Sequence, residues 1–243
     1  MKKNVLYLPD LLEKGRLNLK DLPEGRVTKF ISITGQDGAG KTSLRDGLAE
    51  YYANENNVVM TAKSPCDKHI VNLLNNAISQ GDYKDPYTEE LLFSFCDGLL
   101  SNYMQQLDGR LDYFICQRGP MDQYAHGVTR SGKDFKTIYD IQKPERLFKF
   151  DVYIHLNCNP KIAWERIKED DDKDRYEYPD YFAVQTVNTA RLYGCIVSGN
   201  DPELDFLRES KNYYIDTSNM SIDEVLKAAI LLLKWCNGRL LMH

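Results

Sequence analysis

Two hydrophobic periods alternate along the 243-residue chain. Short runs rich in β-branched and aromatic residues, bounded by glycine or polar residues, indicate buried strands. Such runs lie at 27–34, 57–62, 111–116, 151–157 and 213–216. Longer segments with apolar residues at helical spacing predict helices at 41–52, 69–78, 88–107, 160–169, 181–197 and 221–236. At the start of the last helix, Ser221 and Glu224 form a capping-box pattern.

The alternation of strands and helices predicts the fold class. Strands that are separated by helices form a parallel sheet with helices on both faces. We therefore expect an α/β fold with a doubly wound five-stranded parallel sheet, in one domain over residues 27–243. Residues 1–26 contain Gly15, Pro23 and Gly25 between short apolar stretches, and we interpret them as an N-terminal extension.

Composition narrows the class of protein. The chain is 42% hydrophobic and 28% charged, as in ordinary globular proteins. A formal net charge of -5 argues against a surface that coats nucleic acid. The six cysteines contain no Cys-x-x-Cys pair, so they predict reduced core thiols. No secretory h-region follows the first residues, and the longest aliphatic run, 228–233, is too short to cross a bilayer. We expect a cytoplasmic protein.

The segment 35–42 (GQDGAGKT) lies between a predicted strand and a predicted helix and matches the Walker A pattern. Its glycines allow main-chain N–H groups to converge on phosphate oxygens, and the following helix adds the positive end of its dipole. Lys41 would contact the β- and γ-phosphates, and the Thr42 hydroxyl would ligate Mg²⁺. We therefore expect ATP and Mg²⁺ as cofactors. The expected cofactor-binding residues are Gly35, Asp37, Gly38, Ala39, Gly40, Lys41, Thr42 and Ser43, with Thr42 as the metal ligand.

Other segments decide among the P-loop proteins. The chain has no Asn-Lys-x-Asp motif of the kind that GTPases use. Over residues 29–234 it resembles the thymidylate kinase family of P-loop nucleotide kinases. The resemblance is carried by 30–44 (FISITGQDGAGKTSL), 88–95 (TEELLFSF), 165–177 (ERIKEDDDKDRYE) and 213–225 (YYIDTSNMSIDEV). These segments are similar to the family's first strand and loop, acceptor helix, lid, and adenine-side loop. The resemblance implies a short lid at about residues 166–178.

The resemblance also implies roles for the acceptor side. Asp37 would contact the sugar 3′-hydroxyl of the acceptor, and Phe93 would stack on its base. Arg118 would hold the acceptor phosphate, for which its planar fork is suited. Lys63 stands in the family's acceptor loop and could add a second cationic contact to that phosphate.

The lid carries the remaining catalytic expectation. Gly38 follows the acidic residue of the phosphate loop, as in the bacterial subtype, whose catalytic basic residues lie in the lid. The resemblance therefore implies that Arg175 covers the transition state, with Arg166 and Lys173 as supports. The expected catalytic residues are Lys41, Arg118 and Arg175.

Two positions depart from the family pattern. Gln117 stands where the family has a carboxylate that helps to hold hydrated Mg²⁺, and Asp122 or Asp67 could replace that charge. Asp97 stands where thymidylate kinases carry the arginine that reads the thymine carbonyl. Because an ionised carboxylate only accepts hydrogen bonds, Asp97 favours an exocyclic amine or a hydroxyl on the base. Alternatively, Asp97 faces solvent.

We predict ATP-dependent phosphoryl transfer to a nucleoside monophosphate, with a base specificity that differs from that of thymidylate kinases. Two other interpretations stay open. One is a deoxynucleoside kinase or a kinase of a modified base in DNA, and the other is a catalytically degenerate ATP-binding regulatory protein. The resemblance implies a homodimer formed by helices on one side of the sheet, and the apolar helix at 88–107 would allow it. The expected partner is a nucleotide acceptor, without membrane or nucleic acid.

Overall fold

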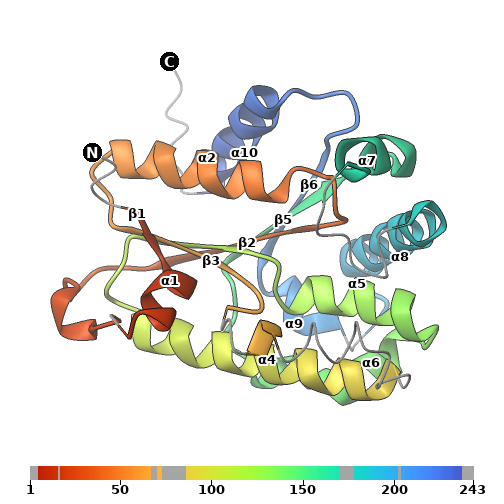
Figure 1. The fold of residues 1–243 in the computed structure, drawn as a ribbon, viewed down its shortest axis with the longest axis horizontal. Coiled ribbons are helices and arrows are strands. Elements are labelled where there is room, and N and C mark those ends of the chain that lie inside the picture. The colour runs from red at the N-terminus through yellow and green to blue at the C-terminus, as the bar shows by residue number, and fades with distance from the viewer. Residues whose placement is uncertain are drawn as a thin grey trace.

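The computed structural model describes residues 5–15, 17–66, 70–72, 86–169, 178–201 and 204–236. A twisted parallel sheet runs through the centre of the molecule (Figure 1). Its strand order is β1-β3-β4-β2-β5-β6, and every neighbouring pair is parallel. The strands are β1 (Val5–Tyr7), β2 (Lys29–Gly35), β3 (Val59–Lys63), β4 (Tyr113–Gln117), β5 (Val152–Asn157) and β6 (Lys211–Asp216).

Helices cover both faces of this sheet (Figure 1). Side chains of α2 and α10 pack on one face, and side chains of α4, α5, α6 and α8 pack on the other. Strand β2 serves both layers, since Phe30 belongs to one hydrophobic cluster and Ile31 and Ile33 to the other. The described helices are α1 (Leu8–Glu13), η1 (Leu19–Asp21), α2 (Lys41–Asn54), α4 (Pro86–Leu107), α5 (Pro120–Ser131), α6 (Phe135–Gln142), η2 (Pro144–Arg146), α7 (Pro160–Ile167), α8 (Pro179–Ser198), α9 (Asp205–Arg208) and α10 (Ile222–Cys236).

The doubly wound parallel sheet is confirmed, but the prediction of five strands was wrong by one. Val5–Tyr7 adds a sixth strand, β1, in which Val5 pairs with Val59 and Tyr7 with Thr61. With only three residues, and with α1 following at once, β1 is too short to produce a readable alternation. The segment expected to be an extension thus supplies part of the sheet. An ion pair between Arg26 and Asp112 ties its end to the domain.

Helices α5 and α6 were not predicted. Residues 120–128 of α5 are all buried, including the polar Asp122, Gln123 and His126, so burial is not confined to an apolar stripe that a sequence pattern would show. The capping box of α10 is confirmed, because Glu224 accepts the N–H of Ser221 at 2.8 Å and its own N–H donates to Ser221 Oγ at 3.3 Å. Residues 70–72 are helical, and the rest of the helix predicted at 69–78 lies outside the described residues.

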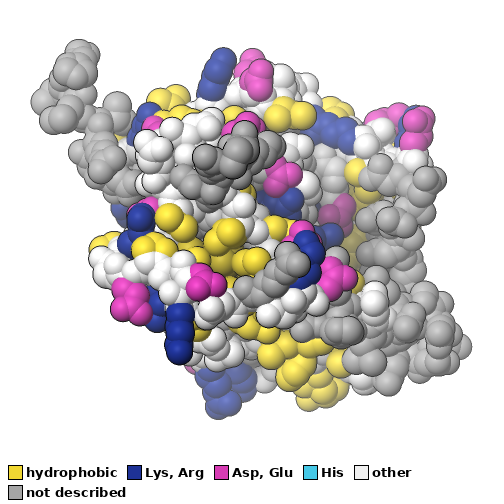
Figure 2. Space-filling model, turned by 60° about the vertical axis from the view of Figure 1, so that its left-hand side comes forward, with side chains coloured by type: hydrophobic (Ala, Val, Ile, Leu, Met, Phe, Trp, Pro, Cys, Tyr) yellow, Lys and Arg dark blue, Asp and Glu magenta, His cyan; other side chains and the backbone are white. Residues whose placement is uncertain are grey.

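The topology decides where a ligand can bind. Because all six strands are parallel, their carboxyl ends lie at one edge of the sheet, and the loop at 35–41 leaves that edge between β4 and β5. The order of strands reverses here, which is where open α/β sheets bind ligands. No described helix is both long enough and apolar enough to traverse a membrane. On the face shown in Figure 2, Lys and Arg side chains are interspersed with Asp and Glu.

Candidate active site

The phosphate loop follows β2 and packs tightly against β5 and α7. A Cβ atom on Gly35 would lie 2.1 Å from the carbonyl oxygen of Leu156, and one on Gly38 would lie 2.3 Å from that of Ala163. Gly38 also has a φ of 77°, in the left-handed region. Only glycine fits at these two positions. Glycine is therefore required at positions 35 and 38 by the close main chain of β5 and α7.

Lys41 begins α2 and is 3% exposed. Its Nζ donates to the carbonyl oxygens of Gly35 at 2.7 Å and Gln36 at 2.8 Å, and to Asp37 Oδ1 at 3.0 Å. All three ammonium protons thus have acceptors within the loop. The positive charge is held at the centre of the loop, among main-chain oxygens.

Asp37 joins this lysine to a second cation. The same oxygen, Asp37 Oδ1, accepts from Arg118 Nη2 at 2.6 Å. Burial acts to raise the pKa of Asp37, but the charges of Arg118 and Lys41 outweigh it and hold that pKa well below its ordinary value. Arg118 follows β4 with a φ of 70°, which is uncommon for a residue other than glycine. The loop and the end of β4 therefore meet at one ionised carboxylate.

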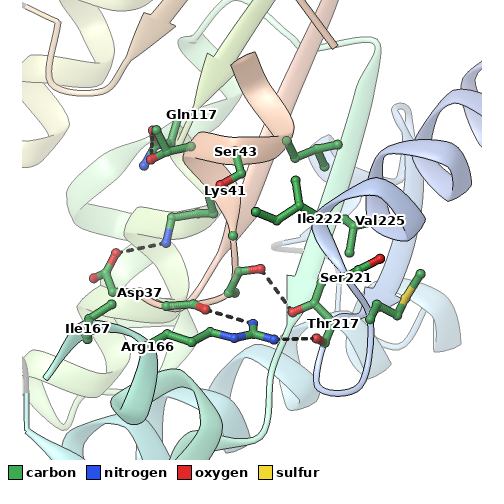
Figure 3. A pocket seen from close by; sticks show the side chains of 16 residues that line it. Asp37, Lys41, Ser43, Gln117, Arg166, Ile167, Thr217, Ser221, Ile222 and Val225 are labelled. Atoms are coloured by element: carbon green, nitrogen blue, oxygen red, sulfur yellow. Dashed lines mark hydrogen bonds and ion pairs between the residues drawn. The ribbon is translucent and has the colours of Figure 1, made fainter. Parts of the chain in front are cut away.

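A pocket of about 590 Å³ opens beside the loop (Figure 3). Arg166, at the end of α7, reaches across it and donates to the carbonyl oxygens of Gly38 at 3.2 Å and Thr217 at 3.0 Å. Ile222 and Val225 of α10 form an apolar side of the pocket. The pocket thus joins phosphate-loop atoms to an apolar wall, as a nucleoside triphosphate requires.

Buried charges lie on the other side of Asp37, between α4 and α5. Glu90 is 0% exposed and pairs with Arg130 at 2.6 Å. The guanidinium of Arg130 lies 4.3 Å from the centroid of the Phe93 ring. A Cβ atom at position 127 would clash with the Glu90 carboxylate, because it would lie only 2.6 Å from Glu90 Oε2. Gly127 therefore leaves the space that the Glu90 carboxylate fills.

Asp97 lies about two turns after Glu90 on α4 and is 2% exposed, so the alternative in which it faces solvent was wrong. Its Oδ1 accepts from Ser64 Oγ at 3.0 Å. Burial raises the pKa of Asp97 to about 8, although the Ser64 hydrogen bond lowers it, and the carboxylates of Asp122 and Glu90 raise it further. A largely protonated Asp97 can both donate and accept a hydrogen bond near neutral pH.

Sequence comparisons with known proteins point to one family. A sequence model of the thymidylate kinase family matches residues 33–194, which is more than half of the chain. The chain belongs to the thymidylate kinase family. A thymidylate kinase of Wolbachia pipientis is 29% identical over 157 residues, which are 61% of this chain and 72% of the relative. A thymidylate kinase of Malacoplasma penetrans is 22% identical over 171 residues, which are 68% of this chain and 79% of the relative.

The solved structures support the fold of this thymidylate kinase family member. The structure of thymidylate kinase from Candida albicans matches with a TM-score of 0.69 and covers 89% of this chain and 96% of its own, at 19% identity. Family and fold together support nucleoside monophosphate kinase activity, and the relatives indicate a nucleotide kinase.

The residues predicted to hold Mg²⁺ lie at the start of α2 and the end of β4. Gln117 Oε1 accepts from Thr42 Oγ1 at 3.0 Å and from Arg45 Nη1 at 3.3 Å, so this amide oxygen is used within the protein. No cluster of three or more acidic, His or Cys side chains suited to a metal occurs in the described parts of the chain. Thr42 fits one oxygen ligand of Mg²⁺. The rest of the coordination would come from water and nucleotide phosphates, as is usual for this ion.

Asp122 could supply the negative charge that Gln117 lacks, but one of its two oxygens already accepts a hydrogen bond. Its Oδ1 accepts the N–H of Gly35 at 2.9 Å, while its Oδ2 has no hydrogen-bond partner among the described residues. Burial raises the pKa of Asp122 to about 6, although Lys41 lowers it. The second candidate, Asp67, lies outside the described residues.

Of the other predicted site residues, the structure describes Lys63 but not Lys173 or Arg175. Lys63 ends β3 opposite Gln117, and its pKa is lowered by partial desolvation and by nearby Arg118, so these two cations share one region. Arg175 and Lys173 lie outside the described residues, and their catalytic role stays a prediction. Sequence reasoning missed Glu90 and Arg130.

A signal for the missed pair was available only in part. Glu90 lies three residues before Phe93, in the segment that resembles the family's acceptor helix. The pairing of Glu90 with Arg130 joins α4 to α5, however, and no local spacing in a single sequence reveals such a contact.

Proposed function

We propose that this protein is an ATP-dependent nucleoside monophosphate kinase whose preferred acceptor base is not thymine. The observation that carries the proposal is the meeting of Lys41 and Arg118 on one carboxylate oxygen of Asp37. Lys41 belongs to the donor loop, and Arg118 ends the strand beside it. A triphosphate on the loop and a monophosphate on Arg118 would therefore have their phosphates side by side, as transfer between them requires.

In this reaction the phosphoryl group passes directly from donor to acceptor, and the protein forms no covalent bond to it. The bond from the γ-phosphorus to its bridging oxygen breaks while an oxygen of the acceptor phosphate bonds to that phosphorus. Main-chain N–H groups of the loop and Lys41 hold the donor phosphates, and Arg118 orients the acceptor phosphate. Bound Mg²⁺ neutralises charge on the donor phosphates. Positioning and charge neutralisation, rather than a general base, provide the acceleration.

The identity of the base rests on Asp97. In its protonated form this side chain can donate to a ring nitrogen or a carbonyl, and in its ionised form it accepts from an exocyclic amine. Thymine offers only carbonyl acceptors beside its single ring N–H. The preference therefore rests on the ionised form, because a protonated Asp97 would also donate to a thymine carbonyl. Adenine, cytosine and guanine each offer an amine, which favours ionised Asp97, whereas the carbonyls of thymine repel it. We propose an amine-bearing base or a hydroxymethylated pyrimidine. The Candida albicans thymidylate kinase is described as having broad substrate specificity, so this fold can accommodate more than one acceptor.

An ADP-release assay tests the proposal. ATP and Mg²⁺ are incubated with the monophosphates and the free nucleosides of thymine, cytosine, adenine, guanine and 5-hydroxymethyluracil. We expect turnover with a monophosphate and higher kcat/KM for an amine- or hydroxymethyl-bearing base than for thymine. Turnover with free nucleosides alone would support a nucleoside kinase instead. Tight ATP binding without any turnover would support a regulatory protein, for which the missing carboxylate at Gln117 is the structural argument.

A further inference from the structure

The side chain of Gln36 has no role in the phosphate-binding chemistry described so far, yet both of its polar ends make hydrogen bonds. It is 1% exposed. Its Nε2 donates to the carbonyl oxygen of Cys158 at 2.7 Å, and its Oε1 lies 2.5 Å from Thr186 Oγ1. An amide oxygen carries no proton, so the hydroxyl of Thr186 is the donor in this contact. The side chain of Gln36 therefore joins the phosphate loop to the end of β5 and to α8.

The main chain of the same residue holds the loop lysine. The carbonyl oxygen of Gln36 accepts from Lys41 Nζ at 2.8 Å and from the N–H of Ala39 at 3.2 Å. Because the Gln36 side chain is held at both polar ends, it restrains the Cα of this residue and therefore the position of the carbonyl that accepts from Lys41.

Helix α8 also contacts α5, which packs against α4. Gln185 Nε2 lies 2.7 Å from His126 Nε2, and Asn188 Nδ2 donates to Thr129 Oγ1 at 3.0 Å. Gln185, Thr186 and Asn188 are neighbours on α8, whereas their partners belong to the phosphate loop and to α5. One short stretch of α8 therefore contacts both the phosphate loop and α5.

We propose that Thr186 and Gln36 are positioning residues, which set the orientation of Lys41 and tie the phosphate loop to α8. The hydroxyl of Thr186 also lies 2.8 Å from the carbonyl oxygen of Phe182 in its own helix. The Thr186 hydroxyl has one proton, so it can donate to only one of these two acceptors at a time. It supports Gln36 when the proton points to Gln36 Oε1 and not to the Phe182 carbonyl. Valine at this position keeps the shape of threonine and leaves Gln36 Oε1 buried without this donor, which removes the link between α8 and the phosphate loop.

The test uses the full chain and the variants Thr186→Val, Thr186→Ser and Thr189→Val. Thr189 lies on the same helix, is buried, and its side chain makes no hydrogen bond to the described residues, so it is a matched control for the substitution itself. We expect Thr186→Val to weaken Mg-ATP binding by about tenfold in calorimetry and to lower kcat by about tenfold, with a smaller effect on the KM of the acceptor. Thr186→Ser should recover wild-type values to within about twofold. Thr189→Val should bind Mg-ATP as the wild type does.

The inference rests on the proposed function, since it assumes that ATP binds the loop. A wild-type protein that binds no Mg-ATP overturns the proposed function. If the wild type binds and Thr186→Val binds equally well with unchanged kcat, only the positioning role is overturned. A double-mutant cycle with Gln36→Met adds a second reading: in that background Thr186→Val should have no further effect, and additive losses would exclude the coupling. If Thr186→Val does not fold, Gln36→Met alone is measured against the same expectation for Mg-ATP binding.

Discussion

The donor side and the acceptor side of this molecule are built from different kinds of atoms. On the donor side, glycines and carbonyl groups surround Lys41, and Gln36, Asp37 and Thr42 supply the side-chain contacts of the loop. On the acceptor side, buried charged side chains face one another, with Glu90, Asp97 and Asp122 each at most 3% exposed. Main-chain groups recognise a triphosphate whatever its base, whereas side chains can distinguish one acceptor from another. The difference explains why the first region carries the family pattern and the second departs from it.

The largest expected effect concerns the donor side. Lys41→Ala removes the only loop cation that can move onto the donor phosphates, so we expect turnover to fall on the order of a thousandfold. ADP release at saturating acceptor measures the loss. The exposed Lys133→Ala is the control and should keep wild-type turnover. Near-normal activity in Lys41→Ala would show that the loop does not hold the reacting phosphates.

The second prediction separates the two sides. Arg118→Ala removes the fork expected to hold the acceptor phosphate, so we expect the KM of the acceptor to rise on the order of a hundredfold and that of ATP to change far less. Steady-state kinetics with each substrate varied in turn gives both values. Arg146→Ala, at an exposed position, serves as the control. Equal increases in both KM values would mean that Arg118 does not distinguish acceptor from donor.

The third prediction concerns Asp97, whose pKa is raised from 3.8 to about 8 by burial. As the pH rises from about 4 to about 8, Asp97 ionises in the unfolded chain but stays protonated in the folded protein. Ionisation stabilises the unfolded chain, so the free energy of unfolding falls over this pH window. Asp97→Asn cannot ionise and keeps an acceptor for Ser64. We expect it to raise the free energy of unfolding by about 2 kcal/mol at pH 8 and by much less at pH 4.5.

Urea unfolding at the two pH values measures this difference, with the exposed Asp223→Asn as control. The same variant should change the ranking of acceptor bases in the ADP-release assay, because an amide always offers one donor and one acceptor. A variant with the wild-type ranking would show that Asp97 does not contact the base.

The smallest expected effect concerns Mg²⁺. Gln117→Asp restores a carboxylate beside Thr42, so we expect the Mg²⁺ concentration for half-maximal ATP binding to fall by about threefold. Calorimetric titrations of ATP at several Mg²⁺ concentrations give the value. Gln117→Asn shortens the side chain without adding charge and should not lower that concentration. An unchanged requirement in Gln117→Asp would place the ion away from this side chain.

The same contrast governs what the sequence could predict. The phosphate loop is eight consecutive residues, so the sequence identified it completely and placed it correctly between a strand and a helix. Phe93, Asp97 and Arg118 could be located by resemblance, one motif at a time. The pairing of Glu90 with Arg130 could not, because it joins two helices whose relative position depends on the whole fold. Helix α5 was missed for a related reason, since its fold surroundings bury polar as well as apolar residues at 120–128.

The short strand β1 has a consequence for the first residues of the chain. It lies at one margin of the sheet and covers the outer hydrogen-bonding groups of β3. A protein cut just before Leu8 would leave β3 with a free row of N–H and C=O groups, which strands of other molecules can use. The opening segment therefore protects the enzyme from aggregation, and shortening it would lower solubility before it affects the chemistry.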